Sequence, residues 1–142
     1  MSEILRNIEI KAKLNDQARA IEKCRELARV DGELIHQVDY FFNVEKGRLK
    51  LRFMGGQSAE LIFYERPNSE GPKLCKYEKC KIEDGKILLN ILKNVLGIRG
   101  VVKKTRNLYL IGQTRVHIDE VVDLGNYLEF EVLNLFIIFM YM

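Results

Sequence analysis

The chain has 142 residues, of which 47% are hydrophobic and 30% charged, with only two prolines. This composition fits one globular domain and excludes a disordered or low-complexity protein. The formal net charge of +3 comes without a basic run, so nucleic-acid binding is not expected. Three cysteines without CxxC spacing, and a start that does not resemble a signal peptide, predict a reducing, cytoplasmic location. The apolar C-terminal stretch is too short for a membrane span, which needs about 20 residues.

The first half of the chain predicts a strand, a helix and then further strands. Apolar and polar residues alternate strictly over Asn7–Leu14, as is typical of a strand. Asn15 or Asp16 then caps a helix that runs to about Arg29, and Asp31-Gly32 ends it. Three strands separated by glycine-containing turns follow at Glu33–Val44, Arg48–Phe53 and Glu60–Arg66.

The second half predicts one helix and four strands. Asp84-Gly85 opens the helix, whose apolar residues keep helical spacing up to Gly97. The strands are Leu74–Ile82, Gly100–Ile111, Gln113–Asp119 and Tyr127–Leu133. Eight strands with two inserted helices indicate an α+β protein built on an antiparallel barrel or a strongly curled sheet.

Charged residues on these strands are segregated by sign. Cations alternate with apolar residues on several strands, and Glu129 and Glu131 project together from the last one. The cations are Arg48, Lys50, Arg52, Arg66, Lys104, Arg106 and Arg115. If these faces line one barrel, the buried charges need partners, and a triphosphate with a divalent metal supplies both signs. The alternative is an exposed sheet with solvated faces and cross-strand salt bridges.

One histidine lies among these charges. His117 shares a face with Arg115 and Asp119. We interpret it as a hydrogen-bonding partner of these neighbours, with metal ligation or proton transfer as the alternative.

Six segments, in order, resemble the CYTH proteins, a family named for class IV adenylyl cyclase and thiamine triphosphatase. They are NIEIK (7–11), QVDYFF (37–42), GRLKLR (47–52), ELIFYERP (60–67), VVKKTR (101–106) and TRVHIDEVVDLGNYLEFEV (114–132). The resemblance spans roughly residues 5 to 133. It implies an antiparallel eight-stranded tunnel-like β-barrel with flanking helices, lined by acidic metal ligands and basic phosphate ligands.

The resemblance also implies roles for individual residues. The ligands of Mg²⁺ or Mn²⁺ are expected to be Glu9, Asp119, Glu129 and Glu131. The substrate-binding residues are expected to be Lys11, Lys50, Arg52, Arg66, Lys104, Arg106 and Arg115. The residues expected to act in catalysis are Glu9, Lys11, Arg52 and Arg106.

The chain departs from the family pattern in two places. Asn7 stands where the family has its first glutamate, so the metal shell loses one charged oxygen. The family usually continues with a helix where this chain has the apolar residues 134–142. We interpret 1–133 as the tunnel domain and 134–142 as an atypical tail, a truncated or replaced end.

The function implied is metal-dependent hydrolysis of a triphosphate, whether inorganic tripolyphosphate, thiamine triphosphate or a nucleoside triphosphate. One alternative is a class IV-type adenylyl cyclase that makes cyclic AMP from ATP, a branch that Thr114–Glu131 resembles. A second alternative is a non-catalytic protein that binds polyphosphate or nucleotides. The expected partner is a small-molecule triphosphate, without nucleic acid or membrane, bound by a monomer or homodimer.

Overall fold

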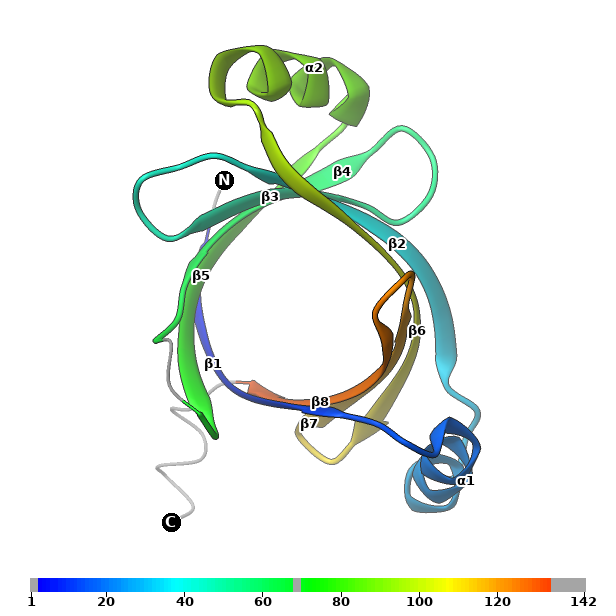
Figure 1. The fold of residues 1–142 in the computed structure, drawn as a ribbon. Coiled ribbons are helices and arrows are strands. Elements are labelled where there is room, and N and C mark those ends of the chain that lie inside the picture. The colour runs from blue at the N-terminus through cyan, green and yellow to red at the C-terminus, as the bar shows by residue number, and fades with distance from the viewer. Residues whose placement is uncertain (1–2, 68–69, 134–142) are drawn as a thin grey trace.

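The computed structural model describes residues 3–67 and 70–133, which form eight strands and two helices (Figure 1). The strands are β1 (Glu3–Lys13), β2 (Glu33–Phe42), β3 (Arg48–Phe53), β4 (Ala59–Glu65), β5 (Lys73–Ile82), β6 (Ile98–Ile111), β7 (Thr114–Val121) and β8 (Gly125–Leu133). The helices are α1 (Gln17–Ala28) and α2 (Gly85–Leu96). Within these residues, neither helix is long and apolar enough to span a bilayer.

The strands close into one antiparallel barrel in the order β1-β5-β4-β3-β2-β6-β7-β8, with β8 pairing back onto β1. Figure 1 looks into the ring, with α2 outside β2 and β3, and α1 outside β6 and β7. The predicted α+β fold with an eight-stranded antiparallel barrel and flanking helices is confirmed. The predicted tail, 134–142, lies outside the described residues.

The apolar core lies outside the barrel wall, beneath the two helices. Phe42, Leu51 and Ala59 form one buried cluster, against which the inner face of α2 packs. Tyr109 and Ile118 belong to a second cluster, covered by α1. Because side chains alternate across a strand, burying one face under helices turns the other face toward the lumen. The helices therefore help to keep the charged faces of β2, β3, β6 and β7 turned toward the lumen.

Both helices begin at an aspartate whose carboxylate accepts a backbone N–H three residues on, at 3.1 Å from Arg19 to Asp16 and 3.2 Å from Ile87 to Asp84. The predicted start of α2 is thus confirmed, and Asp16 rather than Asn15 caps α1. The end predicted for α1, at about Arg29, is confirmed to within one residue. Arg29 already has a left-handed backbone, with φ of 62°, so the helix stops before the Asp31-Gly32 pair.

Several strand boundaries differ from the prediction by a few residues. At these ends the boundary depends on pairing with the neighbouring strand and not on the alternation of apolar and polar residues. β1 begins at Glu3 because β5 pairs with it from there. β2 ends at Phe42, where a register irregularity with β6 interrupts the ladder. β6 begins at Ile98, directly after α2.

Candidate functional site

All eight strands contribute side chains to one cavity of about 550 Å³. Its lining includes every predicted site residue except Asp119, namely Glu9, Lys11, Lys50, Arg52, Arg66, Lys104, Arg106, Arg115, Glu129 and Glu131. Ile10 and Phe130, which alternate with these charges, are partly exposed on the outside. The predicted convergence of the polar faces on one lumen is therefore confirmed, and the alternative of an open, solvated sheet is wrong.

Four cations form one side of the lumen. Lys50 and Arg52 come from β3, and Lys104 and Arg106 come from β6, with β2 between these two strands. We call these four residues the cation wall. Each arginine is held by one buried aspartate, described next.

Asp39 on β2 holds the β3 half of the cation wall. Its carboxylate accepts two hydrogen bonds from Arg52, at 2.8 and 2.9 Å, and one from Lys50 at 3.1 Å. The Gln37 side-chain oxygen, in the orientation that satisfies both amide atoms, also accepts from Arg52 at 3.2 Å. Burial by itself raises the pKa of Asp39, but the bonds from Arg52 and the charge of Lys50 hold it well below its usual range. Asp39 is thus a permanent anion that orients its two cations.

Asp119 on β7 does the same for the β6 half. It is 0% exposed and accepts from Arg106 at 2.7 and 2.8 Å, with Lys104 at 3.5 Å. Burial acts to raise the pKa of this carboxyl too, but the hydrogen bonds and charge of Arg106 lower it. Both oxygens are therefore engaged by cations, and Asp119 does not line the cavity. Its expected role as a metal ligand stays a prediction.

The two lysines of the cation wall are only weakly basic. Burial, and then the charge of the adjacent arginine, lowers the pKa of each to about 8. Lys50 also lies over two rings, 5.5 Å from the Phe41 centroid and 5.1 Å from that of Tyr64. A buried lysine of this kind is stabilised more by a bound anion than an exposed lysine is, because the anion replaces the water that burial has removed.

Three carboxylates form the opposite side of the lumen. Glu9 comes from β1 and Glu129 and Glu131 from β8, the strand next to it; Glu9 is directly paired with Glu131. We call these three residues the carboxylate wall. Burial, and then the charge of Glu129, raises the pKa of Glu9. Converging carboxylates repel one another unless a cation lies between them, so this wall fits a hard divalent metal ion.

Asn7 supports that fit. Its side chain is buried and lines the same cavity, and its Oδ1 atom has no hydrogen-bond partner among the described residues. A buried amide oxygen normally has a partner. This one is available to a cation or to a water bound to it.

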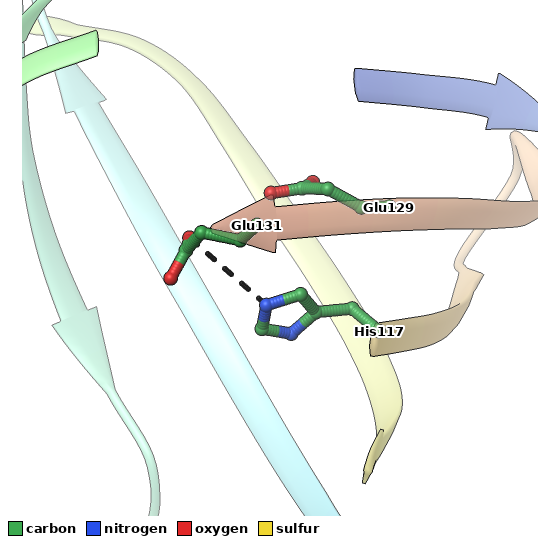
Figure 2. A group of neighbouring side chains, drawn as sticks. All are labelled: His117, Glu129 and Glu131. Carbon is green, nitrogen blue, oxygen red and sulfur yellow. Dashed lines mark ion pairs between the residues drawn. The ribbon is translucent and has the colours of Figure 1, made fainter. Parts of the chain in front are cut away.

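His117 stands beside the carboxylate wall (Figure 2). Potential ligand atoms of His117, Glu129 and Glu131 all lie within 4.8 Å of one another. Burial, and then the charge of Arg106, lowers the pKa of His117 to about 3, so the ring is neutral. The hydrogen bonds that we expected from it to Arg115 and Asp119 are absent: neither ring nitrogen has a hydrogen-bond partner within the described chain.

The remaining predicted cations lie around the carboxylate wall. Arg115 donates a hydrogen bond to Glu131, and Arg66 is 4.0 Å from Glu9. Lys11 is paired in register with Glu129 and lies 5.2 Å from the centre of the Tyr127 ring. All three line the cavity, and their expected contact with phosphate stays a prediction.

Sequence reasoning assigned no role to Asp39. It sits in the segment QVDYFF, where only its alternation with Gln37 and Phe41 marks it as inward-facing. The available signal for a role was that Asp39 is an acidic residue on a side of the lumen that otherwise carries cations. The pairing partner could not be read from it, because Asp39 meets Arg52 through the register of β2 with β3.

A family model for the CYTH domain matches residues 5–134. The chain belongs to the CYTH domain family. This family includes triphosphatases and class IV adenylyl cyclases, and its members are in general metal-dependent. A comparison with curated proteins gives no match.

Solved structures share the fold of this CYTH domain. The PH1012 protein from Pyrococcus horikoshii OT3 has a TM-score of 0.75 at 21% identity, over 90% of this chain and 79% of that one. A putative adenylate cyclase from Vibrio parahaemolyticus has a TM-score of 0.68 at 16% identity, over 90% and 76%. A putative adenylyl cyclase from Hippeastrum, described as having a dominant triphosphatase activity, has 0.65 at 17%, over 90% and 79%. At these identities the likeness shows the fold alone.

Proposed function

We propose that this CYTH domain hydrolyses a triphosphate in its lumen with the help of a divalent cation, Mg²⁺ or Mn²⁺. The observation that carries the proposal is the separation of charge inside the barrel. The cation wall and the carboxylate wall face each other across one cavity, each on its own set of strands. A linear polyanion that brings a cation with it complements both walls at once.

The cation wall is suited to the phosphate chain. Arg52 and Arg106 use part of each guanidinium on Asp39 and Asp119, and the remaining N–H groups are available to phosphate oxygens. Lys50 and Lys104 add charge without fixed direction. Phosphoryl transfer depends mainly on positioning and on charge neutralisation, which a preorganised set of donors supplies.

The carboxylate wall is suited to the metal. Glu9, Glu129 and Glu131 would hold it, with Asp119 a further candidate from the sequence. When bound, such an ion polarises phosphate oxygens and lowers the pKa of a bound water. Lys11, Arg66 and Arg115 would contact the phosphate nearest this wall and stabilise the leaving group. Glu9, as one of the metal ligands, would act in catalysis by holding the ion that activates the attacking water.

Product analysis tests this proposal. The protein is incubated with tripolyphosphate, thiamine triphosphate or ATP, each with Mg²⁺ or Mn²⁺, and the products are separated. We expect orthophosphate and the corresponding diphosphate or pyrophosphate. Cyclic AMP with pyrophosphate from ATP would identify a class IV-type cyclase instead. Binding without turnover under every condition would indicate a non-catalytic binder, and either result would refute hydrolysis.

A matched pair of variants ties the activity to the lumen. Arg52 lines the cavity, whereas Arg99 of β6 is exposed. Arg52→Gln should remove most of the activity and Arg99→Gln should leave it unchanged. Equal loss in both would mean that the measured activity does not arise in the lumen.

A further inference from the structure

The ring of His117 is an exception among the buried polar groups of this barrel. The residue is 4% exposed, yet neither Nδ1 nor Nε2 has a hydrogen-bond partner within the described chain. Leaving a buried polar atom without a partner costs about 1–3 kcal/mol. A histidine that served only to fill the core would be expected to satisfy at least one nitrogen. The unmet nitrogens therefore point to a ligand.

The neighbours of the ring show which kind of ligand fits. His117 is paired in register with Glu129, and Nε2 lies 4.0 Å from Oε2 of Glu131. This gap is too long for a hydrogen bond. Two ligand atoms that share one metal ion at about 2.0–2.2 Å are roughly 3–4 Å apart. Figure 2 shows the ring of His117 beside the carboxylates of Glu129 and Glu131. The other carboxylate oxygen of Glu131, Oε1, accepts a hydrogen bond from Arg115.

We propose that His117, Glu129 and Glu131 form a nitrogen-containing metal site, which binds a first-row transition ion in preference to Mg²⁺. Magnesium favours oxygen ligands and keeps several waters, and it gains little from an imidazole. Zn²⁺ and Co²⁺ accept imidazole and carboxylate together, and their affinities exceed that of Mn²⁺ in the usual order. The expected order of affinity is Zn²⁺ and Co²⁺, then Mn²⁺, then Mg²⁺.

The neutral donor at Asn7 agrees with this assignment. Where the CYTH pattern has a glutamate, this chain offers an amide oxygen that has no hydrogen-bond partner in residues 3–67 and 70–133. The cavity thus combines carboxylates with two neutral donors, His117 and Asn7. The lost negative charge weakens the attraction for any divalent ion, and the imidazole nitrogen compensates for this with transition ions but not with Mg²⁺. The inference rests on the proposed requirement for a divalent cation and assigns a first-row transition ion as the preferred one.

Spectroscopy of the loaded protein tests the site without any substrate. The chain has two histidines, and the other one, His36, is exposed and lies within 3.2 Å of Thr105. Protein free of a histidine tag is loaded with one equivalent of Mn²⁺, and pulsed electron paramagnetic resonance records coupling to imidazole nitrogen. We expect this coupling in the unmodified protein and in His36→Gln. Its absence from the unmodified protein, or its loss in His36→Gln, would overturn the proposal.

Calorimetric titration supplies the second readout. Removing one ligand should weaken Co²⁺ binding by about tenfold to a hundredfold in His117→Gln, while Mg²⁺ affinity changes by less than about threefold. His36→Gln should leave both unchanged. Equal affinity of the unmodified protein for Co²⁺ and Mg²⁺ would contradict the preference. If His117→Gln does not fold, the resonance spectra of the unmodified protein and of His36→Gln decide whether His117 binds the metal. Nitrogen coupling without triphosphate hydrolysis would retain the site and refute the proposed function.

Discussion

Asp39 and Asp119 hold corresponding positions behind the two arginines of the cation wall. Each lies directly opposite its arginine across a strand pair, Asp39 with Arg52 and Asp119 with Arg106. Each also meets one lysine. In the free protein these aspartates offset the cost of burying four cations. They also fix the planes of the guanidinium groups, so the donors are oriented before an anion arrives.

Asp39→Asn should destabilise the free protein strongly. The change keeps the shape but leaves the buried charges of Lys50 and Arg52 unpaired, a loss of roughly 3–5 kcal/mol in the free energy of unfolding. Added tripolyphosphate should recover part of this loss, because it supplies the missing negative charge. Urea unfolding with and without tripolyphosphate measures both effects, with Glu120→Gln on the outside of β7 as control. Equal stability of Asp39→Asn and unmodified protein would show that Asp39 does not hold these cations.

Arginine and glutamate variants of the lumen should respond differently to metal. Arg52→Ala and Arg106→Ala should each lower kcat/KM by about tenfold to a thousandfold, from the ~1.5–4 kcal/mol of one charge-assisted contact. Glu129→Ala should lose activity through weaker metal binding, so excess metal should restore part of it. Added metal should not restore the arginine variants, which lack a directional N–H donor. The rates are titrated against metal concentration, after thermal unfolding confirms that each variant folds. Rescue of Arg52→Ala by metal would contradict the division into two walls.

At the scale of elements, the two outer helices cover the outside of β2, β3, β6 and β7 and so favour one orientation of these strands. Leu51 faces outward from β3 and is fully buried in the cluster covered by α2, and Arg52 beside it faces the lumen. α2 approaches the wall closely because its first residue is Gly85. A Cβ there would lie 2.6 Å from Phe53 Cε1 and 2.7 Å from Ala59 Cβ. The Gly85 N–H also donates to the Gln57 carbonyl at 2.8 Å.

Gly85→Ala should therefore loosen the contact of α2 with the barrel. Overpacking of this kind costs about 1–3 kcal/mol in the free energy of unfolding, more than the gain in helix propensity returns. The neighbouring Lys86→Ala, on the exposed side, should change stability by less than about 0.5 kcal/mol. Urea unfolding of the two variants makes the comparison. If Gly85→Ala were as stable as Lys86→Ala, the helix would not be held at this distance by the missing side chain.

The sequence predicted the faces of this barrel better than its contacts. Period-two alternation decides which side of a strand is charged, so Lys50, Arg106 and Glu129 were found without coordinates. Which residues meet across strands depends on register, which a local pattern does not contain. For this reason Asp39 was missed, and the pairing of Asp119 with Arg106 was not foreseen. The unmet nitrogens of His117 follow from the same cause, because they depend on what every neighbouring strand places around the ring.

At the scale of the whole molecule, the lumen concentrates charge that the net value of +3 conceals. Two lysines in this lumen should make the affinity for an anion depend on pH. Lys50 and Lys104 have pKa values lowered to about 8 by burial and by the neighbouring arginines. Below pH 8 both are charged, which favours the proposed binding of a triphosphate. Above pH 8 the folded protein without ligand loses these two charges, whereas the unfolded chain keeps its lysine protons up to about pH 10.4. The free energy of unfolding therefore rises between pH 8 and about pH 10.4. The affinity for an anion falls over the same range.

The affinity for tripolyphosphate should therefore fall as pH rises through 8. In metal-free buffer the Kd should increase by about tenfold per lysine between pH 7 and pH 9, as one-proton linkage requires. The double variant Lys50→Arg with Lys104→Arg should show a much flatter profile, because arginine does not titrate in this range. Comparing the two profiles removes the contribution of the ligand's own protonation. Identical slopes in both proteins would mean that these lysines are not the titrating groups.

The most direct measurement is the calorimetric titration of tripolyphosphate onto two variants that differ by one position along β6. Lys104 lines the lumen and Lys103 is exposed on the outside. If the triphosphate lies between the two walls, one equivalent should bind per chain. Lys104→Gln should then weaken binding by about tenfold or more, as expected for one lost charged contact, and Lys103→Gln should leave it unchanged. Equal weakening in both variants, or no binding by the unmodified protein, would contradict a triphosphate site inside the barrel.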